Sequence, residues 1–311
     1  MKIQILQGNC IETLQKLDDE SINTCITSPP YWGLRNYNDE EKQLGMEDTP
    51  EEFVDNLVKV FREVKRVLRD DGTVWLNLGD SYSSGGRTTT TNQSLRGDKD
   101  YGVTRPKPSK GIKPKDLIGI PWRVALALQQ DGWYLRQDII WHKPKPMPES
   151  VKDRCTKAHE YIFLLSKNVK YYFDNEAIKE DSKYHGKDKR SDKGNIRYEG
   201  KRTSNKDTKA QQSFVTINPK KNKRSVWTIT TKPFKGAHFA TFPKDLIEPC
   251  VLAGCPEGGT VLDPFGGSGT TGIVAVNHNR HAVLCELNQE YIDLAKDRIN
   301  QEGGMFVDIT E

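Results

Sequence analysis

The sequence predicts an α/β fold in which helices cover both faces of a mostly parallel sheet. Short apolar segments with strand-like alternation are interleaved with amphipathic helical segments over residues 1–82, and the same alternation returns from residue 238 onward. Parallel strands need crossover connections, which helices usually provide. The chain has 311 residues, of which 35% are hydrophobic, so it is long enough to bury a core of this kind.

Local patterns predict the individual elements in order. Alternating apolar residues indicate a strand at 2–7, and a stripe of Ile11, Leu14 and Leu17 indicates a helix. A second helix runs from residue 50 to about residue 71, because Thr49 is a capping residue and Pro50 suits the first helical position. The other strands are expected at 22–27, 73–78, 133–141, 160–166, 260–263 and 281–285, and the other helices at 121–132, 243–254, 270–277 and 288–299. The tryptophans expected in the core are Trp75, Trp122, Trp133 and Trp141.

Two stretches depart from this pattern because they are basic and poor in large apolar residues. Residues 83–115 carry eight Lys and Arg against two Asp, which predicts a basic loop. Residues 179–224 carry 15 Lys and Arg against six Asp and Glu, although the whole chain has a net charge of only +4. The second stretch is either a solvated insertion or a surface for nucleic acid. Tyr184, His185 and Tyr198 interleave with its cations, which favours the nucleic-acid surface, because phosphate contacts need Lys and Arg.

Composition excludes several classes of protein. The chain has no run of about 18 apolar residues, so we expect no membrane span. Its start lacks the apolar stretch of a secretory signal, and its six cysteines form no C-x-x-C pair, so we expect no zinc site and a cytoplasmic location with reduced thiols.

A Gly-rich turn between the strand at 260–263 and the helix at 270–277 is the strongest signal for a cofactor. Its sequence is Asp263-Pro264-Phe265-Gly266-Gly267-Ser268-Gly269-Thr270-Thr271. Glycines let the backbone approach a ligand at the carboxyl end of a strand, where nucleoside-type cofactors bind. The turn lacks the Lys of a phosphate-binding P-loop, and its nominal G-x-G-x-x-G match is shifted along the chain. The alternative interpretation of this turn is a purely structural connection.

Glu286, at the end of the next strand, is placed to accept two ribose hydroxyls. The alternative is that it is simply an acid near a helix start.

A second motif, Ser28-Pro29-Pro30-Tyr31, directly follows the strand at 22–27. Two consecutive prolines force an extended backbone. The Ser28 hydroxyl and the Pro29 carbonyl are therefore fixed acceptors beside the aromatic face of Tyr31. Such a set suits a planar substrate that bears an exocyclic amine, whereas the alternative is a proline turn with a packed aromatic ring.

Together these motifs resemble the catalytic and S-adenosylmethionine-binding motifs of amino-methylating DNA methyltransferases. Their order, with the catalytic motif first, is similar to that of the β group. The resemblance implies a circularly permuted, Rossmann-like methyltransferase fold with a basic variable insertion. It further implies a catalytic part at 1–169, a target-recognition region at 170–225 and a cofactor-binding part of the same domain at 226–311. Double-stranded DNA is the implied partner, and a homodimer and a companion restriction endonuclease are further candidates.

The resemblance also implies roles for individual residues. The catalytic set is Ser28, Pro29, Pro30 and Tyr31. The cofactor-binding set is Asn9, Phe239, Pro243, Asp263, Phe265, Gly266, Gly267, Ser268, Gly269, Thr270 and Glu286. The family often has Asp where this chain has Asn9, so this contact lacks the usual charge.

The expected reaction is direct methylation of an exocyclic amine on a base that has left the duplex. In this family Ser before Pro-Pro is associated more with N4-cytosine and Asp more with N6-adenine, so Ser28 favours cytosine and leaves adenine as the alternative. Methylation at cytosine C5 would need a nucleophilic Cys after Pro, but Cys250 lies in an apolar helical stripe and is expected in the core. A nucleic-acid-binding module without catalysis is the alternative from another class.

Overall fold

The computed structural model describes residues 1–33, 43–83, 112–182, 220–231, 242–303 and 307–310. The chain forms two compact units. The larger comprises residues 1–174 and 225–311, and the smaller comprises residues 175–224.

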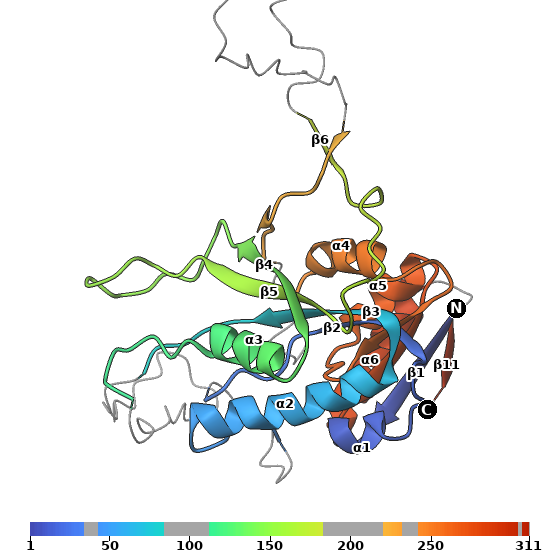
Figure 1. Cartoon of the computed structure of the whole chain (residues 1–311), viewed down its shortest axis with the longest axis horizontal. Helices are drawn as coiled ribbons and strands as arrows, with labels where there is room; N and C mark the ends of the chain where they lie inside the picture. Colours follow the sequence, from blue (N-terminus) through green and yellow to red (C-terminus); the bar gives the residue numbers. More distant parts are fainter. Residues whose placement is uncertain (34–42, 84–111, 183–219, 232–241, 304–306, 311) are drawn as a thin grey trace, which may run out of the picture. The chain divides into compact units, whose positions relative to one another are not determined.

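The larger unit is built on one twisted sheet (Figure 1). In its described residues this sheet has nine strands in the order β11-β1-β10-β9-β2-β3-β5-β4-β8. Neighbouring strands are parallel except where β5 pairs with β3 and β4. The strands are β1 (Lys2–Gln7), β2 (Ile22–Thr27), β3 (Leu68–Leu78), β4 (Tyr134–His142), β5 (His159–Ser166), β8 (Val226–Thr228), β9 (Thr260–Asp263), β10 (His281–Glu286) and β11 (Asp308–Thr310).

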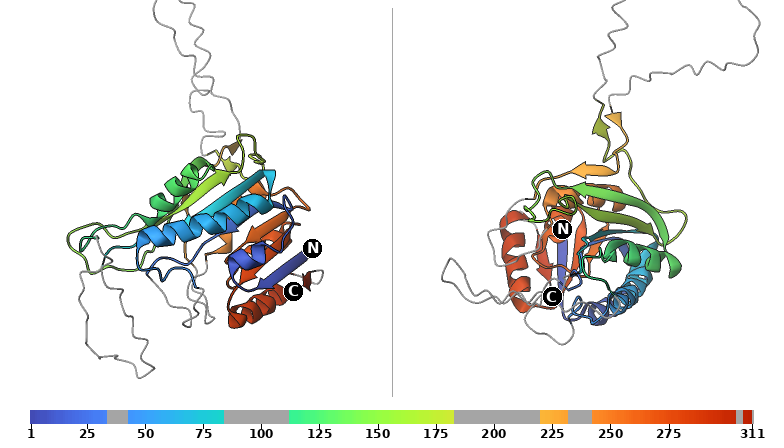
Figure 2. Two further views of the ribbon diagram at one scale, coloured as in Figure 1. Left: turned by 60° about the horizontal axis from the view of Figure 1, so that its bottom comes forward. Right: turned by 90° about the vertical axis from the view of Figure 1, so that its left-hand side faces the viewer.

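Helices cover both faces of this sheet, as predicted. They are α1 (Cys10–Leu14), α2 (Pro50–Val67), α3 (Ile120–Gln130), α4 (Lys244–Gly254), α5 (Thr270–Asn277) and α6 (Gln289–Glu302). One face carries α1, α2 and α3, and the other carries α4, α5 and α6 (Figure 2). The predicted capping residue Thr49 accepts a hydrogen bond from the Glu52 amide at 3.2 Å, so the expected start of α2 is confirmed.

The strand order confirms the predicted circular permutation. Strand β9, which carries the Gly-rich turn, lies in the middle of the sheet between β10 and β2, although it comes late in the sequence. Strand β1, the first in the chain, pairs with β10 with Ile5 opposite Leu284. The amino-terminal and carboxyl-terminal parts of the chain therefore build one continuous sheet.

Some elements differ from the prediction. Strand β3 begins at Leu68, directly after α2, and the short edge strands β8 and β11 were not anticipated. Trp75, Trp133 and Trp141 are buried as expected, but the prediction for Trp122 was wrong, since this residue is 38% exposed. The buried stripe of α3 contains Val124 and Leu128, and Trp122 lies outside it. Its indole packs edge-on against Phe163 with the ring centroids 5.1 Å apart.

The smaller unit contains the short antiparallel pair β6 (Glu180–Asp181) and β7 (Lys220–Lys221), in which Glu180 lies opposite Lys221. The Arg224 guanidinium donates to the Glu180 carboxylate at 2.6 Å. Residues 183–219 lie outside the described residues, and so do Tyr184, His185, Tyr198 and most of the basic loop expected at 83–115.

Candidate active site

The two sequence motifs leave the sheet side by side at one edge. Strands β2 and β9 are parallel neighbours, with Cys25 opposite Leu262, so they end at the same edge. The Thr27 hydroxyl, one residue before Ser28, donates a hydrogen bond to the Asp263 carboxylate at 2.6 Å. The loop that begins at Ser28 and the Gly-rich turn therefore start from positions that touch each other.

Asp263 anchors this junction from inside the protein. It is 1% exposed, and its carboxylate also accepts hydrogen bonds from the Thr271 hydroxyl at 2.6 Å and the Phe265 amide at 3.1 Å. Burial raises the pKa of Asp263 from 3.8 to about 6, and the hydrogen bonds from Thr27, Thr271 and Phe265 oppose this rise. The carboxylate thus holds the turn against both β2 and α5.

Close packing explains why the turn is rich in glycine. A Cβ at Gly266 would lie 2.9 Å from the Leu284 Cβ. Gly269, the N-cap of α5, has φ +76°, and a Cβ there would lie 3.0 Å from the Ala295 Cβ. The helix α6 also supports the turn through Arg298, whose guanidinium donates to the Ser268 carbonyl at 2.6 Å and to the Thr270 hydroxyl at 3.0 Å. Sequence reasoning missed Arg298, because the apolar spacing of its helix gave no sign of this contact.

Glu286, at the end of β10, faces the same turn. One of its carboxylate oxygens accepts from the Gly267 amide at 2.8 Å, and the other accepts from the Asn288 amide at 2.9 Å. Burial raises the pKa of Glu286, and these backbone donors oppose the rise. The carboxylate is held in place, with lone pairs left over for further donors.

The remaining members of the expected cofactor set are spread around this edge. Asn9 follows β1, whose last residue pairs with Glu286, and its side chain caps α1 by accepting from the Ile11 amide at 2.9 Å. Pro243 is the N-cap residue of α4. Phe239 lies outside the described residues.

On the other side of the junction, Tyr31 is held by a chain of polar contacts. Its hydroxyl donates to the Glu160 carboxylate of β5 at 2.8 Å. Burial of the hydroxyl raises the pKa of Tyr31, as does the charge of Glu160, while hydrogen bonds from the Ser28 side chain and the Gly79 backbone oppose the rise. Its ring lies against Gly79, where a Cβ would be 2.4 Å from Tyr31 Cε2.

Glu160 joins Tyr31 to a cation. Its second oxygen is ion-paired with the Lys143 ammonium, and the two side chains are 16% and 20% exposed. The ammonium also lies 4.1 Å from the centroid of the Trp141 ring. Sequence analysis did not select Glu160, although a charged residue beside the apolar run 161–165 was an available signal.

Asp80, which follows β3 at the same edge, orders a neighbouring helix. Its carboxylate accepts from the Gly119 amide at 3.0 Å and from the Ile120 amide at 3.2 Å, at the start of α3. Its backbone carbonyl accepts from the Lys157 ammonium at 2.7 Å. The edge of β3 is therefore tied to both α3 and the segment before β5.

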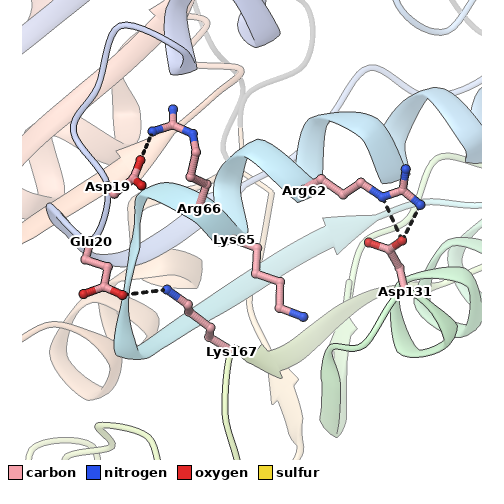
Figure 3. Close-up of a pocket in the computed structure, with 7 residues that line it drawn as sticks. All are labelled: Asp19, Glu20, Arg62, Lys65, Arg66, Asp131 and Lys167. Carbon is pink, nitrogen blue, oxygen red and sulfur yellow. Dashed lines mark hydrogen bonds and ion pairs between the residues drawn. The ribbon is translucent and has the colours of Figure 1, made fainter.

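Two other features lie away from this edge. Cys250 is 1% exposed within α4, as predicted for a core residue, so its thiol is in no position to attack a base. A pocket lined mostly by ion-paired side chains lies at the opposite edge, where β2 begins and β5 ends (Figure 3). Its lining residues are Asp19, Glu20, Arg62, Lys65, Arg66, Asp131 and Lys167.

The fold and this edge define an α/β protein with a nucleoside-type cofactor turn beside a rigid Pro-Pro loop. A family model described as "DNA methylase", of the N6/N4 type, matches residues 22–297. The chain belongs to this family of DNA methyltransferases, as the sequence motifs predicted.

Curated relatives match along nearly the whole chain. The type II methyltransferase M.SmaI of Serratia marcescens is 50% identical over 299 residues, which cover 95% of this chain and 90% of that protein. M.Cfr9I of Citrobacter freundii is 46% identical, with coverage of 96% and 88%.

Solved structures confirm the Rossmann-like methyltransferase fold. The cytosine-N4-specific PvuII DNA methyltransferase has a TM-score of 0.63 at 20% identity and covers 96% of this chain and 86% of its own. The complex of M1.HpyAVI with S-adenosylmethionine has a TM-score of 0.53 at 18% identity, with coverage of 95% and 99%. In the described part of the chain, no helix has the length and apolar character that crossing a bilayer requires.

Proposed function

We propose that this protein transfers a methyl group from S-adenosylmethionine to the N4 amine of a cytosine that has left double-stranded DNA. The observation that carries the proposal is the contact between Thr27 and Asp263, because it brings the cofactor-type turn and the acceptor loop to one site. Ligands of open α/β sheets bind at this carboxyl edge of the strands.

The cofactor lies along the Gly-rich turn in this proposal, and S-adenosylmethionine supplies an electrophilic sulfonium methyl group. Phe265, Gly266, Gly267, Ser268, Gly269 and Thr270 form the wall of the site, with Asn9 and Pro243 at its margins. Glu286 accepts the ribose hydroxyls with the lone pairs that its two backbone donors leave free. Asp263 acts as a positioning residue, because its carboxylate is buried and committed to Thr27, Thr271 and Phe265.

Ser28 and the Pro29 carbonyl prepare the amine for attack. An exocyclic amino nitrogen is a weak nucleophile, since its lone pair is delocalised into the ring. The two acceptors draw its hydrogens out of the ring plane and direct the lone pair toward the methyl group. A new N–C bond forms as the C–S bond breaks, and the displaced amine proton leaves to solvent. Positioning and fixed dipoles provide most of the acceleration.

Tyr31 contributes its ring face to hold the extrahelical base, and its hydroxyl is fixed by Glu160. Ser28 in place of Asp supports cytosine N4 over adenine N6 as the target amine.

The region 170–225 recognises the target, and its positive charge supports contact with DNA phosphates. The type II names of the relatives support a companion restriction endonuclease whose cleavage this methylation blocks.

The test is methyl transfer from tritiated S-adenosylmethionine to unmethylated plasmid DNA, followed by digestion to nucleosides. Label in N4-methylcytosine is the expected result. Label in N6-methyladenine would overturn the choice of base, and label in RNA or protein alone would overturn the substrate. The variant Asp263→Ala should lose cofactor affinity, whereas Asp297→Ala, an exposed carboxylate on α6, should not. If neither the wild-type protein nor the variant binds cofactor, the non-catalytic binding module is the better interpretation.

A further inference from the structure

We infer that the loop between β4 and β5, residues 143–158, is a wedge that enters duplex DNA beside the displaced base, with Met147 occupying the space that the base vacates. This inference rests on the proposed function, because it concerns how that same site gains access to a paired base.

The wedge loop leaves the sheet at the edge where β2 and β9 end, which carries the candidate active site. Strand β5 runs antiparallel to β3, and Tyr161, near its start, lies opposite Leu78, the last residue of β3. Strand β4 ends beside the start of β5, with His142 opposite His159. The loop therefore projects from the edge that also carries Ser28 and Tyr31, and Figure 1 shows it extending beyond the sheet as a long hairpin.

Four contacts hold the wedge loop. Within the loop, the Arg154 guanidinium pairs with Glu149 at 2.6 Å. The same guanidinium lies 3.8 Å from the centroid of the Tyr82 ring, after β3. The other two contacts are Lys115 with Asp153 at 2.7 Å and Lys157 with the Asp80 carbonyl at 2.7 Å. These contacts tie the loop to the residues that follow β3 and to the segment before α3.

The loop also carries an apolar side chain that the protein itself does not bury. Met147 is 84% exposed, more than any other large hydrophobic residue among those described. Pro146 and Pro148 flank it, and each proline restricts the backbone at its own position and at the residue before it. The stiff backbone presents the thioether outward, where exposure to water is unfavourable unless a partner covers it.

The same loop carries exposed cations. Lys145 and Lys152 are exposed, and no carboxylate in the described part of the chain lies within ion-pair distance of either ammonium. The loop as a whole has five Lys and Arg against Glu149 and Asp153. A polyanion with an apolar interior matches this surface, because phosphates pair with the lysines while stacked bases contact the methionine.

Base displacement creates the space that such a side chain fills. A base that rotates out of the duplex leaves its neighbours without a stacking partner and its pairing partner alone. Apolar side chains inserted between base steps compensate for such unstacking in proteins that deform DNA. The loop that carries Met147 leaves the sheet at the edge where the proposed reaction receives the base.

The test compares Met147→Ala with Met147→Leu on a duplex that contains the methylation site mapped by sequencing plasmid DNA modified by the wild-type protein. The same duplex is also prepared with the target base mispaired. Met147→Ala should lower kcat/KM on the paired duplex about tenfold, and less than about twofold on the mispaired one, because a mispaired base leaves the stack more easily. Met147→Leu should stay within about twofold of wild type, since the apolar volume is kept.

A matched control is Val169→Ala, which removes an apolar side chain that is 67% exposed in the turn after β5, at the opposite edge. It should leave kcat/KM on both the paired and the mispaired duplex unchanged. The logarithm of DNA affinity falls linearly with the logarithm of salt concentration. In the double variant Lys145→Ala/Lys152→Ala this slope should become shallower by about two, one for each lost phosphate contact.

An equal loss for Met147→Ala on paired and mispaired duplexes, or no loss on either, would overturn the wedge. The wild-type reaction separates this outcome from failure of the proposed function. If wild type methylates the plasmid and Met147→Ala matches it on the paired duplex, only the wedge is wrong. If wild type labels no DNA, the proposed function itself fails.

Discussion

The two sides of the active-site edge are held together by different means. Around the Gly-rich turn, the Glu286 carboxylate accepts hydrogen bonds from two backbone amides. The Asp263 carboxylate accepts hydrogen bonds from two hydroxyls and one backbone amide. Around Tyr31, most of the polar support comes from side chains, as Glu160 connects the phenol to Lys143, while the Gly79 backbone lies against the ring. The first side needs close approach of the backbone, and the second needs partners from strands that are distant in sequence.

This difference matches the two ligands of the proposed function, the cofactor and the base. A site for an invariant ligand is well served by backbone groups, which few substitutions alter. In the proposed function the other side receives a base from DNA, and side chains from strands distant in sequence hold Tyr31 there. The contact between Thr27 and Asp263 joins the two, and the proposed function predicts that variants on either side separate cofactor binding from methyl transfer.

The largest expected effect follows from removing the acceptor at Ser28. Ser28→Ala should lower the single-turnover rate of methyl transfer by about 10³-fold, because the hydroxyl acts on the amine as the transition state forms. Cofactor affinity, measured by calorimetry, should change less than about twofold, since the turn and its anchors are intact. Comparable losses of rate and affinity would contradict the separation of the two sides.

The buried Asp263 predicts a dependence of stability on pH. Its pKa is about 6 in the folded protein against 3.8 for the free group, so the folded state binds the proton more tightly. The stabilisation from protonation is fully present below about pH 4 and is lost as the pH rises through about 6. Over this range wild type should lose roughly 3 kcal/mol relative to Asp263→Asn, measured by urea unfolding. A pH-independent difference would show that burial does not govern this carboxyl.

A methyl group at residue 79 tests the Tyr31 side. The Gly79→Ala Cβ would lie 2.4 Å from Tyr31 Cε2, so the ring must move away from its position. We expect methyl transfer to fall about 30-fold, because misplacement by about 1 Å can cost this much or more. In a Tyr31→Ala background the same substitution should add little, which a double-mutant cycle measures. Additive losses would mean that Gly79 acts independently of the ring.

The smallest expected effect concerns the charge pair behind Tyr31. Glu160→Gln should reduce kcat about fivefold, because it leaves the Lys143 ammonium without its carboxylate in a mostly buried place. The double variant Lys143→Met/Glu160→Gln removes the stranded charge and should recover part of that loss. A double variant more impaired than Glu160→Gln would assign Lys143 a role of its own.

Local patterns determined most of the secondary structure and both motifs. Thr49 marked the start of α2, and Asp263 to Thr271 identified the turn, because capping and glycine requirements act within a few residues. The edge strand β8 was missed because a strand of three residues shows no periodicity. It forms only because it pairs with β4. The prediction for Trp122 was wrong because a place in a predicted helix does not by itself show on which face of that helix a residue lies.

By itself, the sequence determined the alternation of strands and helices, the two ligand loops and the location of the positive charge. Only the tertiary structure decided that Thr27 touches Asp263, that Glu160 lies between Tyr31 and Lys143, and that Arg298 supports the turn. Spacing within a strand or helix is set by local geometry, and it can be read from neighbouring residues. Contacts between residues 129 or 236 positions apart depend on strand order, which follows from burial of the whole core.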